Sequence, residues 1–164
     1  MAVDMSNPID SLVALLNEAH HLVFFTGAGL STESGIPDFR SPGTGLWNKI
    51  KPIEFSDFVN SEDARAESWR RKFTGDRAMA KADPNSGHLA IAELVKMDRC
   101  TGVITQNVDN LHQQSGVDDS HIVELHGNAT YAKCLQCDQR YDLDDLEAQY
   151  QRTQQIEPCS LCGG

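Results

Sequence analysis

Apolar and polar positions along residues 1–130 form a repeated pattern of strand-like and helix-like segments. Short apolar runs at residues 22–25 and 101–105, and an alternating segment at 121–125, have the length and composition of strands. Segments 9–19 and 86–97 place apolar residues at helical spacing, so each predicts an amphipathic helix, the first of them covering one face of a sheet. Strands that alternate with helices in this way predict the α/β class.

A less regular segment lies between the first strand and the second helix. Residues 41–47 are rich in proline and glycine, which predicts a loop. Scattered apolar residues from 53 to 73 predict short helices of a small lobe, in which we expect Trp69 and Phe73 to pack in a core. Cys100, at the end of the second helix, is expected to be a small buried residue rather than a nucleophile.

The first predicted strand runs directly into Gly27-Ala28-Gly29. In α/β proteins, a glycine turn after a strand lets the backbone approach a phosphate group, and the N-terminus of the next helix attracts the anion. Thr32 replaces the third glycine of the usual dinucleotide pattern, so a plain tight turn also explains this stretch. Asp38, Phe39 and Arg40 follow, and a ring beside a charged pair favours a polar ligand with a flat ring.

Polar residues also follow the other two predicted strands. Gln106-Asn107-Val108-Asp109 comes after the second strand, where polar side chains usually belong to the ligand crevice, although a helix cap is an alternative explanation. His126 follows the third strand in a register that would place it beside Asn107 and Asp109. A histidine before a glycine is more often structural, but an imidazole has a reference pKa of about 6.5 and can act as a base near pH 7.

The cysteines are grouped by pairs towards the end of the sequence. Cys134 and Cys137 form one C-x-x-C turn, Cys159 and Cys162 form another, and 21 residues separate the two. Two such turns can complete a tetrahedral thiolate site, so we expect one structural zinc ion. An iron–sulfur cluster and a redox dithiol are the alternatives. This pairing is typical of metal ligands in a reducing compartment rather than of disulfides.

Charge and hydropathy limit the partners and the compartment. The 164 residues include 24 Asp and Glu against 14 Lys and Arg, a net charge of −10. This argues against nucleic acid as a direct partner and suits a protein that meets basic, lysine-bearing segments. The sequence has no signal peptide pattern and no segment that approaches a membrane span, so we expect a cytoplasmic protein without membrane contact.

Several of these motifs together resemble the sirtuin family of NAD-dependent protein deacylases. The segment from Gly27 to Arg40 is similar to the family's cofactor loop, residues 105–112 are similar to its T-Q-N-x-D-x-L-H signature, and His126-Gly127 and the paired C-x-x-C turns also match. Gly45-Leu46-Trp47 resembles the segment that closes over NAD. The resemblance implies cofactor contacts at Gly27, Ala28, Gly29, Ser31, Ile36, Asp38, Phe39, Arg40, Gln106, Asn107 and Asp109.

The resemblance also implies a reaction. Acetyl-lysine of a protein substrate would attack the nicotinamide ribose and expel nicotinamide, and the acetyl group would leave on ADP-ribose. His126 would be the catalytic base and Asn107 a second catalytic residue. A mono-ADP-ribosyltransferase on the same fold and a non-catalytic fragment that holds NAD or zinc remain alternatives.

The resemblance further predicts how the chain is divided. Residues 1–130 would form a Rossmann-like NAD-binding domain, which includes a cofactor loop at 41–84 and the small helical lobe, and residues 131–164 would form the zinc-binding module. The family pattern continues beyond the second C-x-x-C turn, so we expect a parallel sheet that is incomplete at the C-terminal side.

Overall fold

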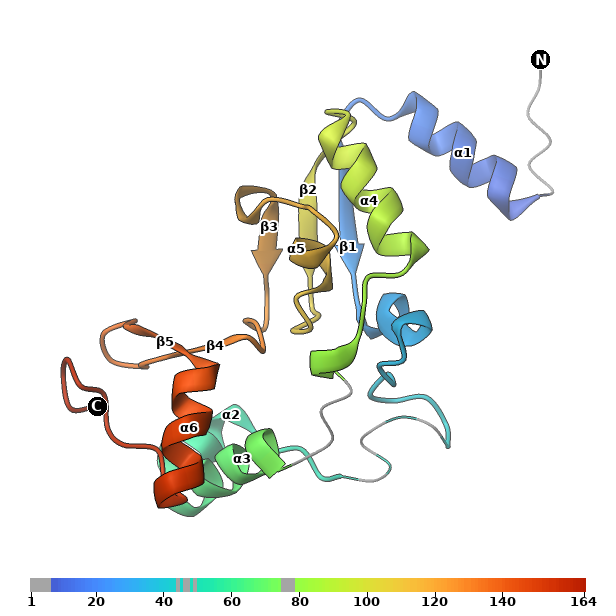
Figure 1. Cartoon of the computed structure of the whole chain (residues 1–164). Coiled ribbons are helices and arrows are strands. Elements are labelled where there is room, and N and C mark those ends of the chain that lie inside the picture. The colour runs from blue at the N-terminus through green and yellow to red at the C-terminus, as the bar shows by residue number, and fades with distance from the viewer. Residues whose placement is uncertain (1–6, 44, 46–47, 49, 75–78) are drawn as a thin grey trace.

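The computed structural model describes residues 7–43, 45, 48, 50–74 and 79–164 (Figure 1). Thr44, Leu46 and Trp47 of the predicted loop lie outside the described residues. In chain order the elements are α1 (Pro8–Glu18), β1 (Leu22–Thr26), η1 (Ala28–Ser34), α2 (Phe55–Asn60), α3 (Glu62–Thr74), η3 (Met79–Lys81), α4 (Ser86–Lys96), β2 (Cys100–Thr105), α5 (Leu111–Gln114), η4 (Asp119–His121), β3 (Ile122–Glu124), β4 (Tyr131–Lys133), β5 (Arg140–Asp142) and α6 (Leu143–Thr153).

The strands β1, β2 and β3 form a three-stranded parallel sheet with β2 in the centre. Phe24 of β1 lies opposite Val103 of β2, and Ile104 of β2 lies opposite Val123 of β3. Parallel neighbours need a crossover connection, and α4 lies in the crossover between β1 and β2. The predicted α/β class with a parallel sheet is therefore confirmed.

The core of the sheet region lies between α4 and one face of the sheet (Figure 1). Ile91 and Val95 of α4 pack in one cluster with Val103 of β2, which is 1% exposed. Cys100 belongs to the same cluster, so its predicted burial is confirmed. The helix begins where the Asn85 side chain accepts hydrogen bonds from the first-turn backbone.

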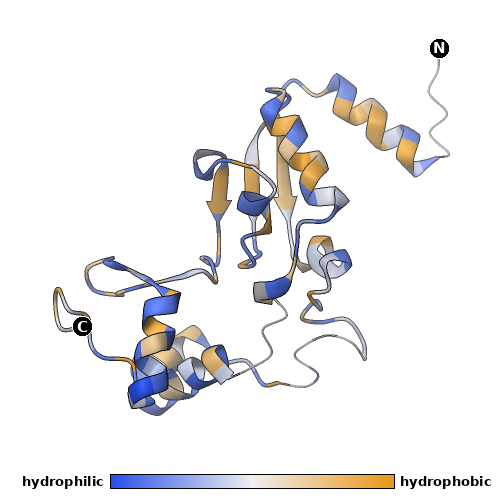
Figure 2. Ribbon diagram, viewed as in Figure 1, coloured by the Kyte–Doolittle hydropathy of each residue, from blue (hydrophilic) through white to orange (hydrophobic). Residues whose placement is uncertain are grey.

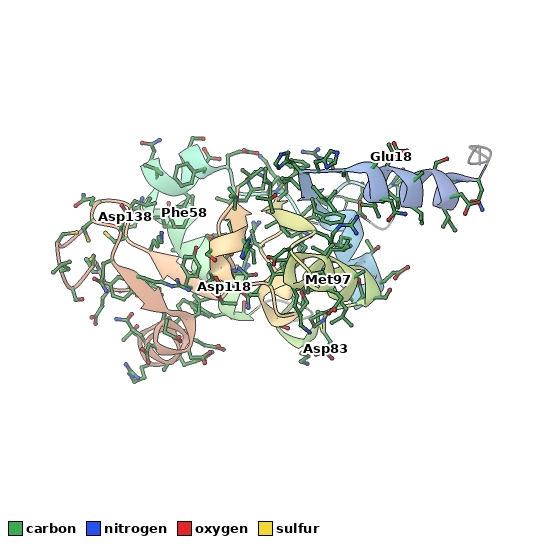
Figure 3. The ribbon with its side chains drawn as sticks, turned by 90° about the horizontal axis from the view of Figure 1, so that it is seen from above. Glu18, Phe58, Asp83, Met97, Asp118 and Asp138 are labelled. Atoms are coloured by element: carbon green, nitrogen blue, oxygen red, sulfur yellow. The ribbon has the colours of Figure 1, made fainter. Side chains whose placement is uncertain are left out.

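The first helix does not cover the sheet, and that part of the prediction is wrong. α1 forms, with Asn7 Oδ1 accepting a hydrogen bond from Ile9 N at 3.0 Å. It nevertheless extends away from the sheet in both views (Figures 1 and 3). Its apolar side chains face solvent, with exposed fractions of 69% for Ile9, 55% for Leu12 and 62% for Leu15, and Figure 2 shows the apolar stretch along the helix.

The sheet face opposite α4, which the first helix was expected to cover, is also exposed. Successive side chains of β1 alternate between faces, so Leu22 and Phe24 pack towards α4 whereas Val23 and Phe25 point the other way. Phe25 is 63% exposed. An amphipathic pattern specifies a helix with one apolar side, but it carries no information on which surface covers that side.

A second packed region combines α3, α6 and the β4–β5 hairpin, and α2 packs on α3. The Phe73 ring lies 5.6 Å from the Trp69 ring, to which it is stacked, and 5.3 Å from the Tyr150 ring of α6. Phe73 is buried, and Trp69 packs against the same cluster, so the predicted core role of both residues is confirmed. This cluster therefore joins the helical lobe to the segment that follows residue 130 (Figure 1).

Candidate active site and metal centre

The carboxyl ends of the three parallel strands meet at one edge of the sheet. Backbone hydrogen bonds continue the strand pairing past the last residues of the strands. Gln106 N donates to Thr26 O at 3.0 Å, and Leu125 N donates to Thr105 O at 2.9 Å. The three segments predicted to form the site therefore leave the sheet side by side.

The glycines in and after the turn that follows β1 differ in backbone conformation. Gly27 caps η1 in an extended conformation that any residue adopts, with φ at −140°. The left-handed position is Gly35 at the other end of η1, with φ at 83°, so the conformational need for glycine lies there. A Cβ added at Gly29 would meet no atom within 4 Å, and one at Gly27 would lie 3.6 Å from Gln106 Nε2. Both glycines thus leave the backbone open.

The side chains of three predicted cofactor residues form a buried hydrogen-bond network between these segments. Ser31 Oγ donates to Asp109 Oδ2 at 2.6 Å. Asn107 Nδ2 donates to Ser31 Oγ at 3.1 Å and to Gly27 O at 3.1 Å. Exposed fractions of 0% for Ser31, 8% for Asn107 and 7% for Asp109 show that water does not compete for these bonds. The structure therefore brings the glycine loop and the segment after β2 together, as the sequence predicts.

A second buried layer lies under this network, and the sequence analysis missed it. Thr26 Oγ1 donates to Thr105 Oγ1 at 2.9 Å and so accepts from His112 Nε2 at 2.9 Å. Asn107 N donates to Thr105 Oγ1 at 3.0 Å, which connects the two layers. The His112 ring packs edge-on against the His88 ring at 5.2 Å. His112 lies within the family-like segment 105–112 and His88 within the predicted helix 86–97, and neither position was recognised as part of a buried network.

Burial keeps both of these histidines neutral. It lowers the pKa of His112 to about 4, with the neighbouring His88 acting in the same direction and Asp109 opposing it. Burial also lowers the pKa of His88, again against the pull of Asp109. His88 Nδ1 accepts from Asn85 N at 3.3 Å, so the ring proton is on Nε2. Among the described residues, this Nε2 and His112 Nδ1 have no hydrogen-bond partner.

The Asp38–Arg40 stretch forms its own turn. Asp38 Oδ2 accepts hydrogen bonds from Ser41 N at 3.0 Å and from Arg40 N at 3.4 Å. The hydrogen bonds from Ser41 are the main cause that lowers the Asp38 pKa. Ile36 is 7% exposed and packs in a small cluster with Leu111. This contact links the loop after β1 to the segment after β2, while the ligand roles of these residues stay predictions.

Four thiols converge in the C-terminal part of the chain. The sulfur atoms of Cys134, Cys137, Cys159 and Cys162 all lie within 4.8 Å of one another. The closest pairs cross between the two turns, with Cys134 Sγ at 3.5 Å from Cys162 Sγ and Cys137 Sγ at 3.6 Å from Cys159 Sγ. Zinc–thiolate bonds of about 2.3 Å in a tetrahedron bring sulfurs to similar distances. Four thiolates leave the ion no open position, so the site fits a structural zinc.

The hairpin next to the thiols supplies a further contact. Tyr141 Oη donates to Cys159 Sγ at 2.9 Å, and this hydrogen bond is the main cause that lowers the pKa of that thiol to about 6. Hydrogen bonds from backbone N–H groups lower the pKa of the Cys134 thiol, and the bond from Gln136 N has the largest effect. Both contacts favour the thiolate form, which is the form that binds metal.

The fold and the four-cysteine site agree with one known family. A sequence model described as the Sir2 family matches residues 27–164. The chain belongs to the Sir2 family. The resemblance to sirtuins drawn from the motifs is thereby confirmed, together with the Rossmann-like α/β fold class that carries a small zinc-binding module.

Relatives in this Sir2 family are close in sequence and longer than this chain. An NAD-dependent protein deacetylase of Rhodopseudomonas palustris is 48% identical over 162 residues, which make up 99% of this chain and 64% of that protein. NAD-dependent protein deacetylase 1 of Bradyrhizobium diazoefficiens is 47% identical over 162 residues, 99% of this chain and 63% of that protein. The chain therefore spans less than two thirds of the length of these relatives.

Solved Sir2 structures have the same fold. A complex of Sir2 with a p53 peptide and NAD+ aligns with a TM-score of 0.77 at 32% identity, covering 100% of this chain and 61% of that one. Sir2 bound to an acetylated peptide aligns with a TM-score of 0.76 at 31% identity, covering 95% of this chain and 60% of that one.

Three further predicted site residues of this Sir2-family chain are exposed. Gln106 is exposed at the end of β2, and its amide is near Gly27. His126 lies two residues beyond β3 and is exposed. Phe39 is 37% exposed. Their contacts with a cofactor or substrate stay predictions.

Proposed function

We propose that this Sir2-family chain carries the site of an NAD-dependent protein-lysine deacetylase, which transfers the acetyl group of acetyl-lysine to ADP-ribose and releases nicotinamide. The observation that carries the proposal is the buried network at the ends of the parallel strands, in which Ser31 holds Asn107 and Asp109 beside Gly27. Family membership and the names of the two bacterial relatives support it.

The polar groups present fit an NAD molecule lying across this edge. A buried amide and a buried carboxylate complement a carboxamide, so we assign Asn107 and Asp109 to the nicotinamide amide. The open backbone of residues 27–29 suits the diphosphate, and the exposed Gln106 amide suits a ribose. Residues Ser31, Ile36, Asp38, Phe39 and Arg40 would bound the nicotinamide end. When bound, NAD would supply an electrophilic ribose carbon and a leaving group.

In this proposal, His126 removes a proton from a hydroxyl group during acetyl transfer. Its exposed position beyond β3 leaves the ring accessible from the edge of the sheet at which the other site segments emerge. Asn107 would assist by fixing the nicotinamide end, since its amide is already held by Ser31 and Gly27. General-base catalysis of this kind contributes about 10²- to 10⁴-fold to a rate.

We further propose the division of the chain and its partners. Residues 1–130 form the NAD-binding domain with its cofactor loop at 41–84 and the helical lobe, and residues 131–164 form the zinc module, with the α3–α6 cluster as their contact. The net charge of −10 suits basic segments that carry acetyl-lysine and opposes nucleic acid. Among the described helices, none combines the length and hydropathy needed to cross a bilayer. We place the protein in the cytoplasm, without membrane contact.

The test combines NAD binding with peptide deacetylation. We expect calorimetry to detect NAD binding to the zinc-loaded 164-residue chain and mass spectrometry to detect deacetylation of a basic acetyl-lysine peptide. His126→Ala should lower turnover by about 10²- to 10⁴-fold while NAD binding is kept. His20→Ala, which changes an exposed histidine outside the site, is the matched control.

Other outcomes would favour the alternatives. Turnover of His126→Ala at the wild-type rate would contradict the assignment of the base. Labelled ADP-ribose that stays on protein would favour a mono-ADP-ribosyltransferase. No NAD binding by the wild-type chain would favour a non-catalytic fragment.

A further inference from the structure

One carboxylate at the end of β3 gathers hydrogen bonds from three separate segments. Glu124 Oε1 accepts from Gln113 Nε2 of α5 at 2.7 Å and from Asn128 Nδ2 at 2.6 Å. Glu124 Oε2 accepts from Tyr131 Oη at 3.0 Å. The side chain is only partly buried, yet both of its oxygens are engaged. None of these contacts is explained by the proposed chemistry, so they need a separate account.

One of the donors belongs to the turn that follows β3. Gly127 has a φ of 76°, which makes this turn tight and favours glycine. The Asn128 amide also donates to Asn110 Oδ1 at 2.9 Å, and Ala129 N donates to Val108 O at 2.7 Å. The turn is therefore fixed on one side to the segment after β2 and on the other side to the Glu124 carboxylate.

Another donor belongs to the metal module. Tyr131 opens β4, pairs with Asp142 of β5, and precedes Cys134 by three residues in the chain. The Arg140 guanidinium lies 3.7 Å above the Tyr131 ring, which holds the ring in place from the second strand of the hairpin. The position of the Tyr131 hydroxyl is thus set by the same hairpin that carries the thiols.

We propose that Glu124 is a positioning residue that makes the order of the His126 turn depend on metal in the four-cysteine site, with Tyr131 as the link between them. The importance of this coupling for catalysis rests on the proposed role of His126, whereas the coupling itself does not. The Glu124 carboxylate contacts both the turn, through Oε1, and the hairpin, through Oε2.

The physical reason lies in how a carboxylate is held. An ionised carboxylate accepts hydrogen bonds at both oxygens, and bonds to a charged acceptor are stronger than neutral ones. When the hairpin loses its metal, the Tyr131 hydroxyl moves away and no longer donates to Glu124 Oε2. The carboxylate can then rotate away from Asn128. The turn then loses its contact with β3 while the sheet stays folded.

Hydrogen exchange on the 164-residue chain tests the link without any need for activity. In the wild type, removal of zinc by a chelator should raise exchange of amides 125–130 by about tenfold, together with that of the module. In Tyr131→Phe, the same amides should exchange about tenfold faster already in the zinc-loaded form, and chelation should add less than about twofold. Tyr150→Phe, a buried tyrosine of α6, is the matched control and should behave as the wild type.

Two results would overturn the proposal. The first is an unchanged exchange of amides 125–130 when the wild-type chain loses zinc. The second is a Tyr131→Phe variant with the wild-type response, which would make Glu124 a local anchor without a connection to the metal.

A kinetic arm separates this proposal from the proposed function. If the chain deacetylates a peptide, Glu124→Gln and Tyr131→Phe should lower kcat about tenfold with the peptide KM changed by less than about twofold, because they act through His126 rather than on the substrate. An equal loss in KM would contradict a positioning role. If the chain shows no turnover, the proposed function fails, and the exchange experiment still decides the coupling.

Discussion

The site at the strand ends and the four-cysteine module are held together in opposite ways. At the strand ends, residues from distant parts of the sequence meet through buried hydrogen bonds such as that of Ser31 to Asp109. In the module, two short turns bring four thiols within 4.8 Å, and the segment that carries them contains a short hairpin and one helix. The first arrangement depends on a correctly packed sheet, and the second on an ion.

This difference predicts which region tolerates which disturbance. The strand-end network is bonded to the second buried layer through Thr105 and has no need of metal, since its bonds join protein groups to protein groups. The module buries few apolar side chains, so thiolate ligation has to supply most of its stability. Perturbing one region at a time should therefore leave the other largely intact, apart from the contact through Glu124.

Zinc removal should have the largest effect. Structural zinc ligation by thiolates contributes on the order of 10 kcal/mol to small modules, so a strong chelator should unfold residues 131–164. Hydrogen exchange should rise throughout this segment while β1 and β2 remain protected. Exchange that is unchanged after verified zinc loss would contradict this expectation, and unfolding of the whole sheet would show that the two regions are not separable.

The second largest effect is expected from acid, which should lower the unfolding free energy through the strand-end site. The pKa of His112 is about 4 in the folded chain and about 6.5 in the unfolded chain. Between these two pH values, the unfolded state therefore binds more protons at this ring than the folded state does. Stability from the neutral ring is complete above pH 6.5 and is lost as the pH falls towards 4, by up to about 3 kcal/mol. Denaturant unfolding at a series of pH values measures this loss.

A histidine variant separates this effect from the titration of carboxylates. His112→Gln keeps a donor for Thr26 Oγ1 and cannot be protonated, so its unfolding free energy should fall less steeply between pH 6.5 and 4. His121→Gln changes an exposed histidine and should keep the wild-type slope. Equal slopes for His112→Gln and the wild type would show that the buried ring is not the group responsible.

The two regions also differ in how far the sequence predicted them. The metal site followed from spacing alone, because each C-x-x-C turn presents its thiols whatever the surrounding fold. The strand-end residues Asn107 and Asp109 were found because the polar ends of parallel strands meet at one edge. Thr26 and Thr105 were not found, since a short side chain at the end of a strand has no pattern that distinguishes a network from a cap. The buried His88 of α4 and His112 of α5 were not found either.

The position of α1 could not be derived for a related reason. Its periodicity predicts the helix and its apolar side, and both are present. Packing partners are set by tertiary geometry, which local spacing does not encode. The left-handed position at Gly35 was not predicted either, because it follows a 3-10 helix that helical periodicity does not reveal.

The smallest of these effects concerns the centre of the strand-end network. Asp109 accepts hydrogen bonds from Ser31 Oγ and from Leu111 N. Asp109→Asn replaces one acceptor oxygen with an NH2 group. Ser31 Oγ already accepts a hydrogen bond from Asn107 Nδ2, so it does not compensate for the change. One buried bond to a charged group is lost, which should lower the unfolding free energy by about 2 kcal/mol in urea. Asp83→Asn, an exposed carboxylate, should cost nothing measurable and is the control. If the two variants are equally stable, the network is incidental and the contrast with the metal module no longer holds.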